Sequence, residues 1–120
     1  MSDKDNTSGK QAEALAAQYL ERAGLQVLQR NFRCRGGEID LVCRDGKALV
    51  FVEVRLRRNA HYGGAAASIT TGKQARIILA ARHYLNAHAA TNSDCRFDCV
   101  LLDALDKNRI EWLRDAFSAA

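Results

Sequence analysis

The chain has 120 residues, of which 48% are hydrophobic and 27% are charged, so it can bury one core but is too short for two domains of ordinary size. No apolar run approaches the roughly 20 residues of a membrane span, and the first residues lack the pattern of a secretion signal, which predicts a cytoplasmic protein that does not enter membranes. The whole net charge of +4 comes from residues 30–58, which include eight basic and four acidic residues. This concentration of charge indicates either a polyanion-binding surface or an ordinary solvated basic face.

The first half of the chain predicts a helix followed by three strands. Residues 1–8 are polar and unpatterned and are expected to form a flexible N-terminus. Ser8 and Gln11 resemble a capping box, and apolar residues then recur at helical spacing until Gly24 ends the segment. Strands are expected at residues 25–33, 38–44 and 48–56. Asp45-Gly46 predicts an antiparallel hairpin between the last two. Gly36-Gly37 permits a tight turn or a close backbone approach to a ligand, and a simple connector is the open alternative.

The second half predicts a helix and two further strands. Residues 59–71 are rich in Gly, Ala, Ser and Thr and are expected to form a mobile flap. Thr71 and Gln74 give a second capping-box pattern, and that helix should run to about Ala87. Strands are expected at residues 96–103 and 109–113, and residues 118–120 form a short tail. The order αβββαββ indicates an α/β fold with a sheet of four or five strands, in which the second helix is the crossover to a parallel neighbour.

The cysteines are interpreted as reduced structural residues. Disulfides are rare in cytoplasmic proteins, and the four positions contain no C-x-x-C pair: Cys34, Cys43, Cys95 and Cys99. Two of them, Cys43 and Cys99, fall in strand patterns, where a small buried thiol is usual. A zinc site that uses all four is the open alternative.

Acidic residues inside two hydrophobic strand patterns are the strongest functional signal. Burial of a carboxylate is costly without a partner, so Asp40 and Glu53 each call for a cation or a metal ion. The hairpin brings these two acids close together. Two carboxylates beside a cation form a candidate Mg²⁺ or Mn²⁺ site.

The two-residue repeat of a strand predicts which side chains share a face. In the first of the two strands it places Glu38, Asp40 and Val42 on one face, and Ile39, Leu41 and Cys43 on the other. In the second it places Glu53 on the face shared by Leu49, Phe51 and Arg55, with Val50, Val52, Val54 and Leu56 opposite.

Both predicted helices offer polar residues to this site. Glu13 falls on the border of the first helix's apolar stripe, so it can lean over the sheet toward the acids or point into solvent. Gln74 lies one turn before the apolar part of the second helix, which indicates that the start of this helix faces a polar pocket. Lys73 and Arg76 beside it can reach a phosphate, although by themselves they are typical of a solvated face.

The acidic motif resembles a known nuclease signature. Asp40, followed by Glu53-Val54-Arg55 on the adjoining strand, resembles the restriction-endonuclease-like core, PD-(D/E)XK, whose signature is an Asp and then (Asp/Glu)-x-Lys. A closer resemblance is to the bacterial YraN-type family of uncharacterised proteins, which is similar to archaeal Holliday junction resolvases. The matching motifs cover nearly the whole chain: Gly9-Lys10-Gln11-Ala12-Glu13, Asn31-Phe32-Arg33, Gly37-Glu38-Ile39-Asp40-Leu41, Phe51-Val52-Glu53-Val54-Arg55, Lys73-Gln74 and Arg96-Phe97-Asp98.

The resemblance implies a single endonuclease-like domain over residues 9–117 and a site for Mg²⁺ or Mn²⁺. Its metal ligands would be Asp40, Glu53 and Glu13, and its catalytic set would add Arg55 and Gln74. Arg55 stands where the signature has lysine; arginine keeps its charge and cannot act as a base, although its planar fork can stabilise a phosphate. Contacts with nucleic acid are expected from Arg33, Arg35, Arg57, Arg58, Lys73 and Arg76.

Three functional interpretations stay open at this point. The first is an endonuclease that hydrolyses DNA, branched or junction DNA included, by metal-activated water. The second is a nucleic-acid-binding protein that keeps the nuclease fold with little or no turnover because of Arg55. The third is a structural ion pair between Glu53 and Arg55 within the strand, with no ligand. Resolution of a junction would favour a symmetric homodimer, since two matched strands must be cut.

Overall fold

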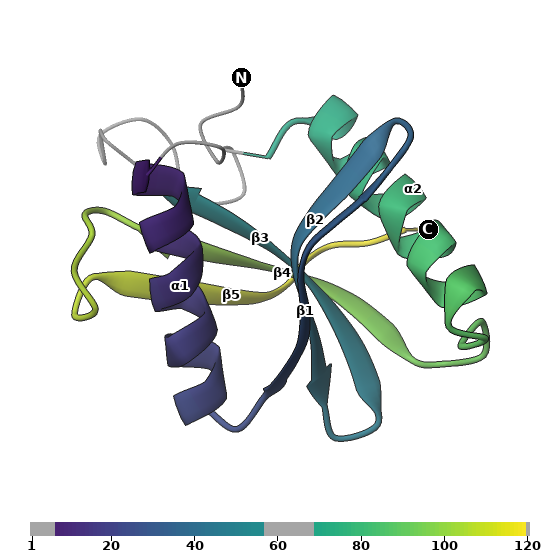
Figure 1. Ribbon diagram of the computed structural model, residues 1–120, viewed down its shortest axis with the longest axis horizontal. Coiled ribbons are helices and arrows are strands. Elements are labelled where there is room, and N and C mark those ends of the chain that lie inside the picture. The colour runs from purple at the N-terminus through teal and green to yellow at the C-terminus, as the bar shows by residue number, and fades with distance from the viewer. Residues whose placement is uncertain (1–6, 57–68, 120) are drawn as a thin grey trace.

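The computed structural model describes residues 7–56 and 69–119, which form a five-stranded mixed sheet with one helix on each face (Figure 1). The elements are α1 (Thr7–Arg22), β1 (Gln26–Cys34), β2 (Gly37–Asp45), β3 (Ala48–Leu56), α2 (Thr71–Ala87), β4 (Cys95–Leu102) and β5 (Ile110–Phe117). This is the predicted order αβββαββ. Residues 57–68, which include Arg57, Arg58 and most of the expected flap, lie outside the described residues.

The sheet has its strands in sequence order, β1-β2-β3-β4-β5. Neighbouring strands are antiparallel except β3 and β4, which run parallel with Glu53 opposite Cys99. Parallel strands need a crossover connection, and α2 supplies it. The predicted role of the second helix is therefore confirmed.

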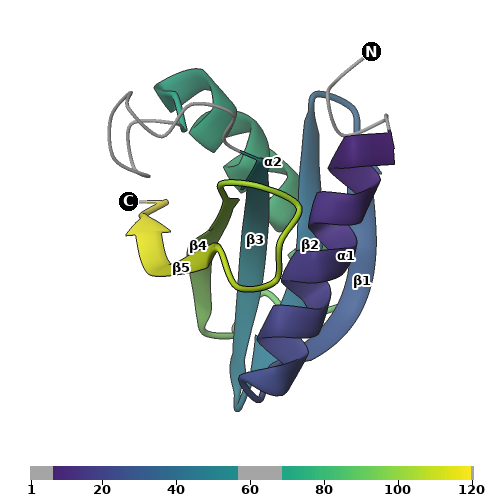
Figure 2. The ribbon, with the colours of Figure 1, turned by 90° about the vertical axis from the view of Figure 1, so that its left-hand side faces the viewer.

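Two apolar cores, one on each face of the sheet, hold the three layers together. Alanines on α1 and Leu20 pack against one face, where they meet Leu41, Cys43, Val50, Val52, Val54, Val100 and Leu102. On the other face α2 covers Ile39, Val42, Leu49, Phe51, Phe97, Cys99 and Leu101. Figure 2 looks from the α1 side, with α1 in front of the sheet and α2 behind it.

The ends of several elements differ from the sequence prediction. Helix α1 begins at Thr7, before the predicted cap at Ser8. Helix α2 is capped by Thr70, whose hydroxyl accepts a hydrogen bond from the Lys73 backbone N–H at 3.1 Å, so the predicted cap at Thr71 is one residue late. Strand β5 continues to Phe117 because its pairing with β4 resumes beyond an irregularity between Phe97 and Cys99.

The alternation of side chains is regular in β3 and broken in β2. The predicted faces of β3 are confirmed, with Leu49 and Phe51 in the α2-side core and the valines in the α1-side core. In β2, Ile39 joins Val42 on the α2 side, whereas Leu41 faces α1. The predicted face of Ile39 is therefore wrong, because the strand bends at Asp40, where its pairing with β3 ends.

The described residues contain free cysteines and no membrane-spanning helix. The thiols of Cys43 and Cys99 are buried, Cys34 is half-buried and Cys95 is exposed. Neither α1 nor α2 is long and apolar enough to cross a membrane. The zinc alternative finds no support in the described ranges, because these cysteines form no metal-binding group there.

Candidate active site

The carboxylate of Asp40 lies at a fork between β2 and β3. The two strands pair from Asp45 and Ala48 as far as Leu41 and Val52, and beyond that level they diverge (Figure 1). The Asp40 side chain links the two strands beyond their last backbone pair, because its Oδ2 accepts a hydrogen bond from the Val54 backbone N–H at 2.7 Å. Asp40 is only 1% exposed. The hydrogen bond therefore fixes a buried carboxylate oxygen beside β3, at the point where β2 leaves it.

Glu53 faces the start of α2, where it meets Lys73. The Lys73 Nζ lies 3.4 Å from Glu53 Oε2 and 3.7 Å from Glu38 Oε1. Glu53 is 2% exposed and the Lys73 side chain 19%. Glu53 thus has an ion pair with an ammonium from another element, and the contacts described for residues 53 and 55 include no ion pair between these two side chains.

The close approach of α2 to β2 at Gly37 gives Lys73 its reach. A Cβ atom on Gly37 would overlap the carbonyl oxygen of Arg76 and stand 3.2 Å from Ala80 Cβ. The preceding Gly36 has φ +86°, a conformation that side chains rarely adopt, and it lies in the two-residue turn between β1 and β2. The expected turn occurs at Gly36, whereas the close backbone approach at Gly37 is made to helix α2, and the expected approach to a ligand stays a prediction.

Glu13 is buried between α1 and the sheet. It is 3% exposed and lies one turn before Ala16 and Ala17, which pack against the sheet. This burial excludes the orientation toward solvent, and the orientation toward the acids stays a prediction. Glu13 and Lys73 therefore come from helices on opposite faces of the sheet.

The other predicted site residues are placed as follows. Gln74 donates its side-chain amide to the Ile69 carbonyl at 3.1 Å, at the entry to α2. Arg55 is half-buried two residues after Glu53. The guanidinium of Arg33 lies 3.5 Å from Glu38 Oε2, with 55% of its side chain exposed. Arg35 and Arg76 are exposed. Arg57 and Arg58 belong to the stretch that the structure leaves undescribed.

Glu38 also belongs to this site, although it was not among the predicted site residues. Its carboxylate joins Arg33 to Lys73 at 3.5 and 3.7 Å. The pattern carried a signal, because Glu38 lies two residues before Asp40. The contact with Lys73 depends on the position of α2, which strand periodicity does not specify.

The carboxylates can hold a divalent cation in one particular way. In the described part of the chain no three His, Cys, Asp or Glu side chains are grouped so that they alone could hold a metal ion. Mg²⁺ does not require such a cage, since it is usually bound by one or two carboxylates together with water and substrate phosphates. Asp40 and Glu53 are both buried and directly adjoin the last paired positions of β2 and β3, Leu41 and Val52, so two carboxylates are available for that mode of binding.

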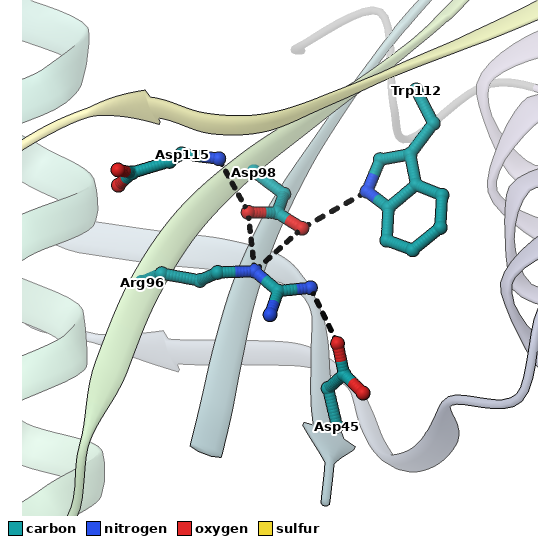
Figure 3. Close-up of polar contacts among 5 residues, drawn as sticks. All are labelled: Asp45, Arg96, Asp98, Trp112 and Asp115. Carbon is teal, nitrogen blue, oxygen red and sulfur yellow. Dashed lines mark hydrogen bonds and ion pairs between the residues drawn. The ribbon is translucent and has the colours of Figure 1, made fainter.

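A further buried acid, Asp98, is engaged by side chains and backbone of the protein itself (Figure 3). It is fully buried, and its carboxylate accepts hydrogen bonds from Arg96 Nε at 3.1 and 3.2 Å, Trp112 Nε1 at 2.9 Å and the Asp115 backbone N–H at 2.9 Å. The Arg96 guanidinium also reaches Asp45 Oδ2 at 2.9 Å. This cluster ties the β2–β3 turn to β4 and β5. Its acid is saturated by internal donors, so we assign Asp98 a structural role.

Comparison with known proteins identifies one family over most of the chain. The model of a family described as "Uncharacterised protein family UPF0102" matches residues 12–102. A UPF0102 protein of Dechloromonas aromatica is 58% identical over 117 residues, which cover 98% of this chain and 93% of the relative. One from Methylobacillus flagellatus is 54% identical, covering 92% and 96%, and one from Nitrosomonas europaea is 51% identical, covering 91% and 92%.

Proposed function

The chain belongs to the uncharacterised protein family UPF0102, and we propose that it is a metal-dependent phosphodiesterase that cleaves DNA. The observation that carries the proposal is the contact between Lys73 Nζ and Glu53 Oε2 at 3.4 Å. The nuclease signature that the sequence resembles needs an ammonium beside the second acid, and the strand offers Arg55 in its place. Helix α2 supplies an ammonium from a different position in the chain.

The residues of the site have separable roles in such a reaction. A bound Mg²⁺ or Mn²⁺ would activate water and neutralise charge on the phosphate. Asp40 and Glu53 would hold the ion, and Glu13 would support it from the α1 side. Lys73 would stabilise negative charge that develops on the phosphate, and the guanidinium of Arg55 would contact phosphate oxygens.

The surrounding charge favours a nucleic acid as the substrate, and the choice of DNA follows from the nuclease resemblance. Exposed arginines at positions 33, 35 and 76 lie on the β1–β2 hairpin and on α2, the elements that contribute Glu38 and Lys73. Such side chains bind phosphates without regard to base sequence. The resemblance to junction resolvases adds branched DNA as a candidate substrate and a homodimer as the form that would cut two strands.

A nucleic-acid-binding protein without turnover is the second candidate. The observation in its favour is that Lys73 contacts both Glu38 and Glu53, so the protein's own ammonium compensates the acids. A site neutralised in this way can be stable without a metal ion. The two candidates differ in whether added Mg²⁺ or Mn²⁺ yields DNA products.

A cleavage assay on linear, single-stranded and four-way DNA with Mg²⁺ or Mn²⁺ tests the proposal. Wild type should cut at least one substrate, Asp40→Asn and Lys73→Gln should lose activity by about 100-fold or more, and Arg82→Gln on the exposed side of α2 should be unaffected. Full activity in Asp40→Asn would refute the assignment of the site. Salt-sensitive binding by a wild type that yields no products with either metal would favour the second candidate. Activity that appears in Arg55→Lys alone would show that arginine is what blocks turnover.

A further inference from the structure

Strands β1 and β2 bend at the same level, at Asn31 and Asp40. On β2 the side chain of Ile39 enters the α2-side core and that of Leu41 the α1-side core, although both would share a face in a regular strand. On β1 the partner of Leu41 is Arg30 and the partner of Ile39 is Phe32, which packs on the α2 side. Both strands therefore change face between these pairs.

Asn31 carries the backbone conformation that makes the bend. Its φ is +52°, in the left-handed region that L-residues with a side chain rarely occupy. Asparagine is, after glycine, among the residues that enter this region most readily, and β-branched residues do so least readily. The Asn31 side chain is exposed, so packing does not explain the choice of residue.

The bend decides what happens to Asp40. Beyond the bend, β1 and β2 stay paired from Phe32 and Ile39 to Cys34 and Gly37. The outer part of this hairpin is therefore separated from β3 while its own two strands stay together. In a straight β2, a backbone carbonyl would accept the hydrogen bond from the Val54 N–H. Here the Asp40 carboxylate accepts it, in the space between the two strands. The same departure carries Gly37 and Glu38 to α2.

We propose that Asn31 is a positioning residue for this site. Its left-handed backbone opens the fork between β2 and β3, and the open fork sets the Asp40 carboxylate on the Val54 N–H, next to Glu53. The catalytic meaning of this placement rests on the proposed function. The placement itself can be measured without any enzymatic activity.

The test is the exchange rate of the Val54 amide hydrogen, followed by NMR in the full chain. Asn31→Val should raise this rate by tenfold or more, toward the rate in Asp40→Ala, which removes the acceptor. Asn31→Gly, which enters the left-handed region freely, should retain the wild-type rate. Arg30→Val, at an exposed neighbouring position whose φ is not positive, is the matched control and should leave Val54 unchanged. The Val50 amide, in the paired part of β3, reports on general loosening.

Each result decides the proposal. Unchanged Val54 exchange in Asn31→Val would overturn it, and so would equal loss of protection in Asn31→Gly and Asn31→Val, because the side chain and not the backbone would then matter. If Asn31→Val does not fold, Asn31→Ala takes its place against the same glycine variant. If wild type cleaves DNA, Asn31→Val should lower kcat tenfold or more with little change in KM. Asn31→Gly should keep the wild-type kcat. A selective Val54 effect in a protein that cleaves nothing would support the placement and refute the nuclease.

Discussion

Substitution of Gly37 by alanine should push α2 away from β2. The added Cβ would overlap the Arg76 carbonyl oxygen and stand 3.2 Å from both Ala80 Cβ and Ala80 N. Carbon atoms prefer separations of about 3.5–4.0 Å, so the second and third turns of α2 must withdraw by on the order of 1 Å. Backbone atoms cannot rotate out of the way as the end of a side chain can. Overpacking of this kind costs about 1–3 kcal/mol.

The displacement should reach the candidate site through Lys73. Its Nζ lies 3.4 Å from Glu53 Oε2, and withdrawal of the first turns of α2 would lengthen this contact beyond ion-pair distance. Urea unfolding of Gly37→Ala should give a midpoint shifted downward with an unchanged slope. DNA cleavage should fall together with stability. Gly72→Ala is the matched control, because Gly72 lies beside Lys73 in the first turn of α2 and a Cβ there would meet open space. Its free energy of unfolding should equal or exceed that of wild type.

A Gly37→Ala protein as stable as wild type would refute this reasoning. It would show that α2 can move over β2 at no cost, so the helix would not be held at the distance that Lys73 requires. Loss of stability with intact cleavage would leave the packing argument standing and remove its connection to the site.

Three further outcomes follow from the structure. Asp98→Ala should lower the free energy of unfolding in urea by about 3–5 kcal/mol, because it removes the buried partner of the Arg96 charge. Asp45→Asn, at the more exposed ion pair of Arg96, should lower it by about 1 kcal/mol or less. Equal losses would contradict the central role given to Asp98 in the cluster of Figure 3. Burial, and then the charges of Asp98 and Glu21, raise the pKa of Cys43 from 9.0 to about 12. A raised pKa contributes stability below pH 9 that is lost as the pH rises toward 12, so Cys43 should account for about 1.4 kcal/mol of the stability lost between pH 8 and pH 10. Cys43→Ala should abolish that portion, and an equal decline in both proteins would show that the thiol is not responsible. DNA affinity should fall with salt, and Arg33→Ala should reduce the slope of log K against log salt by about 1 relative to Arg82→Ala; salt-independent binding would exclude phosphate contacts as its source.

Much of the fold followed from short-range patterns. The repeat of two in β3 sorted its valines from Leu49 and Phe51, and Asp45-Gly46 gave the hairpin that pairs β2 with β3. The same repeat failed for Ile39, because a left-handed residue in β1 bends both strands. Periodicity assumes a regular backbone, and Asn31 is compatible with both a regular and a bent one.

The acids of the site were recognisable and their partners were not. A carboxylate within a hydrophobic strand is costly wherever the strand is buried, so Asp40 and Glu53 could be selected without coordinates. Lys73 was open to two interpretations, a phosphate contact or an ordinary solvated face. The structure places it beside Glu53 and Glu38.

By itself the sequence determined the order αβββαββ, the faces of β3 and the two buried acids, because these depend on neighbours a few positions apart in the chain. Only the tertiary structure decided that α2 approaches β2 at Gly37, that β2 leaves β3 at Asp40 and that Lys73 meets Glu53. Those contacts join residues on different elements, and their geometry depends on how closely a helix can lie on a sheet and where a strand bends. The chain therefore shows which residues are costly to bury, and the packing of its layers shows which residues compensate them.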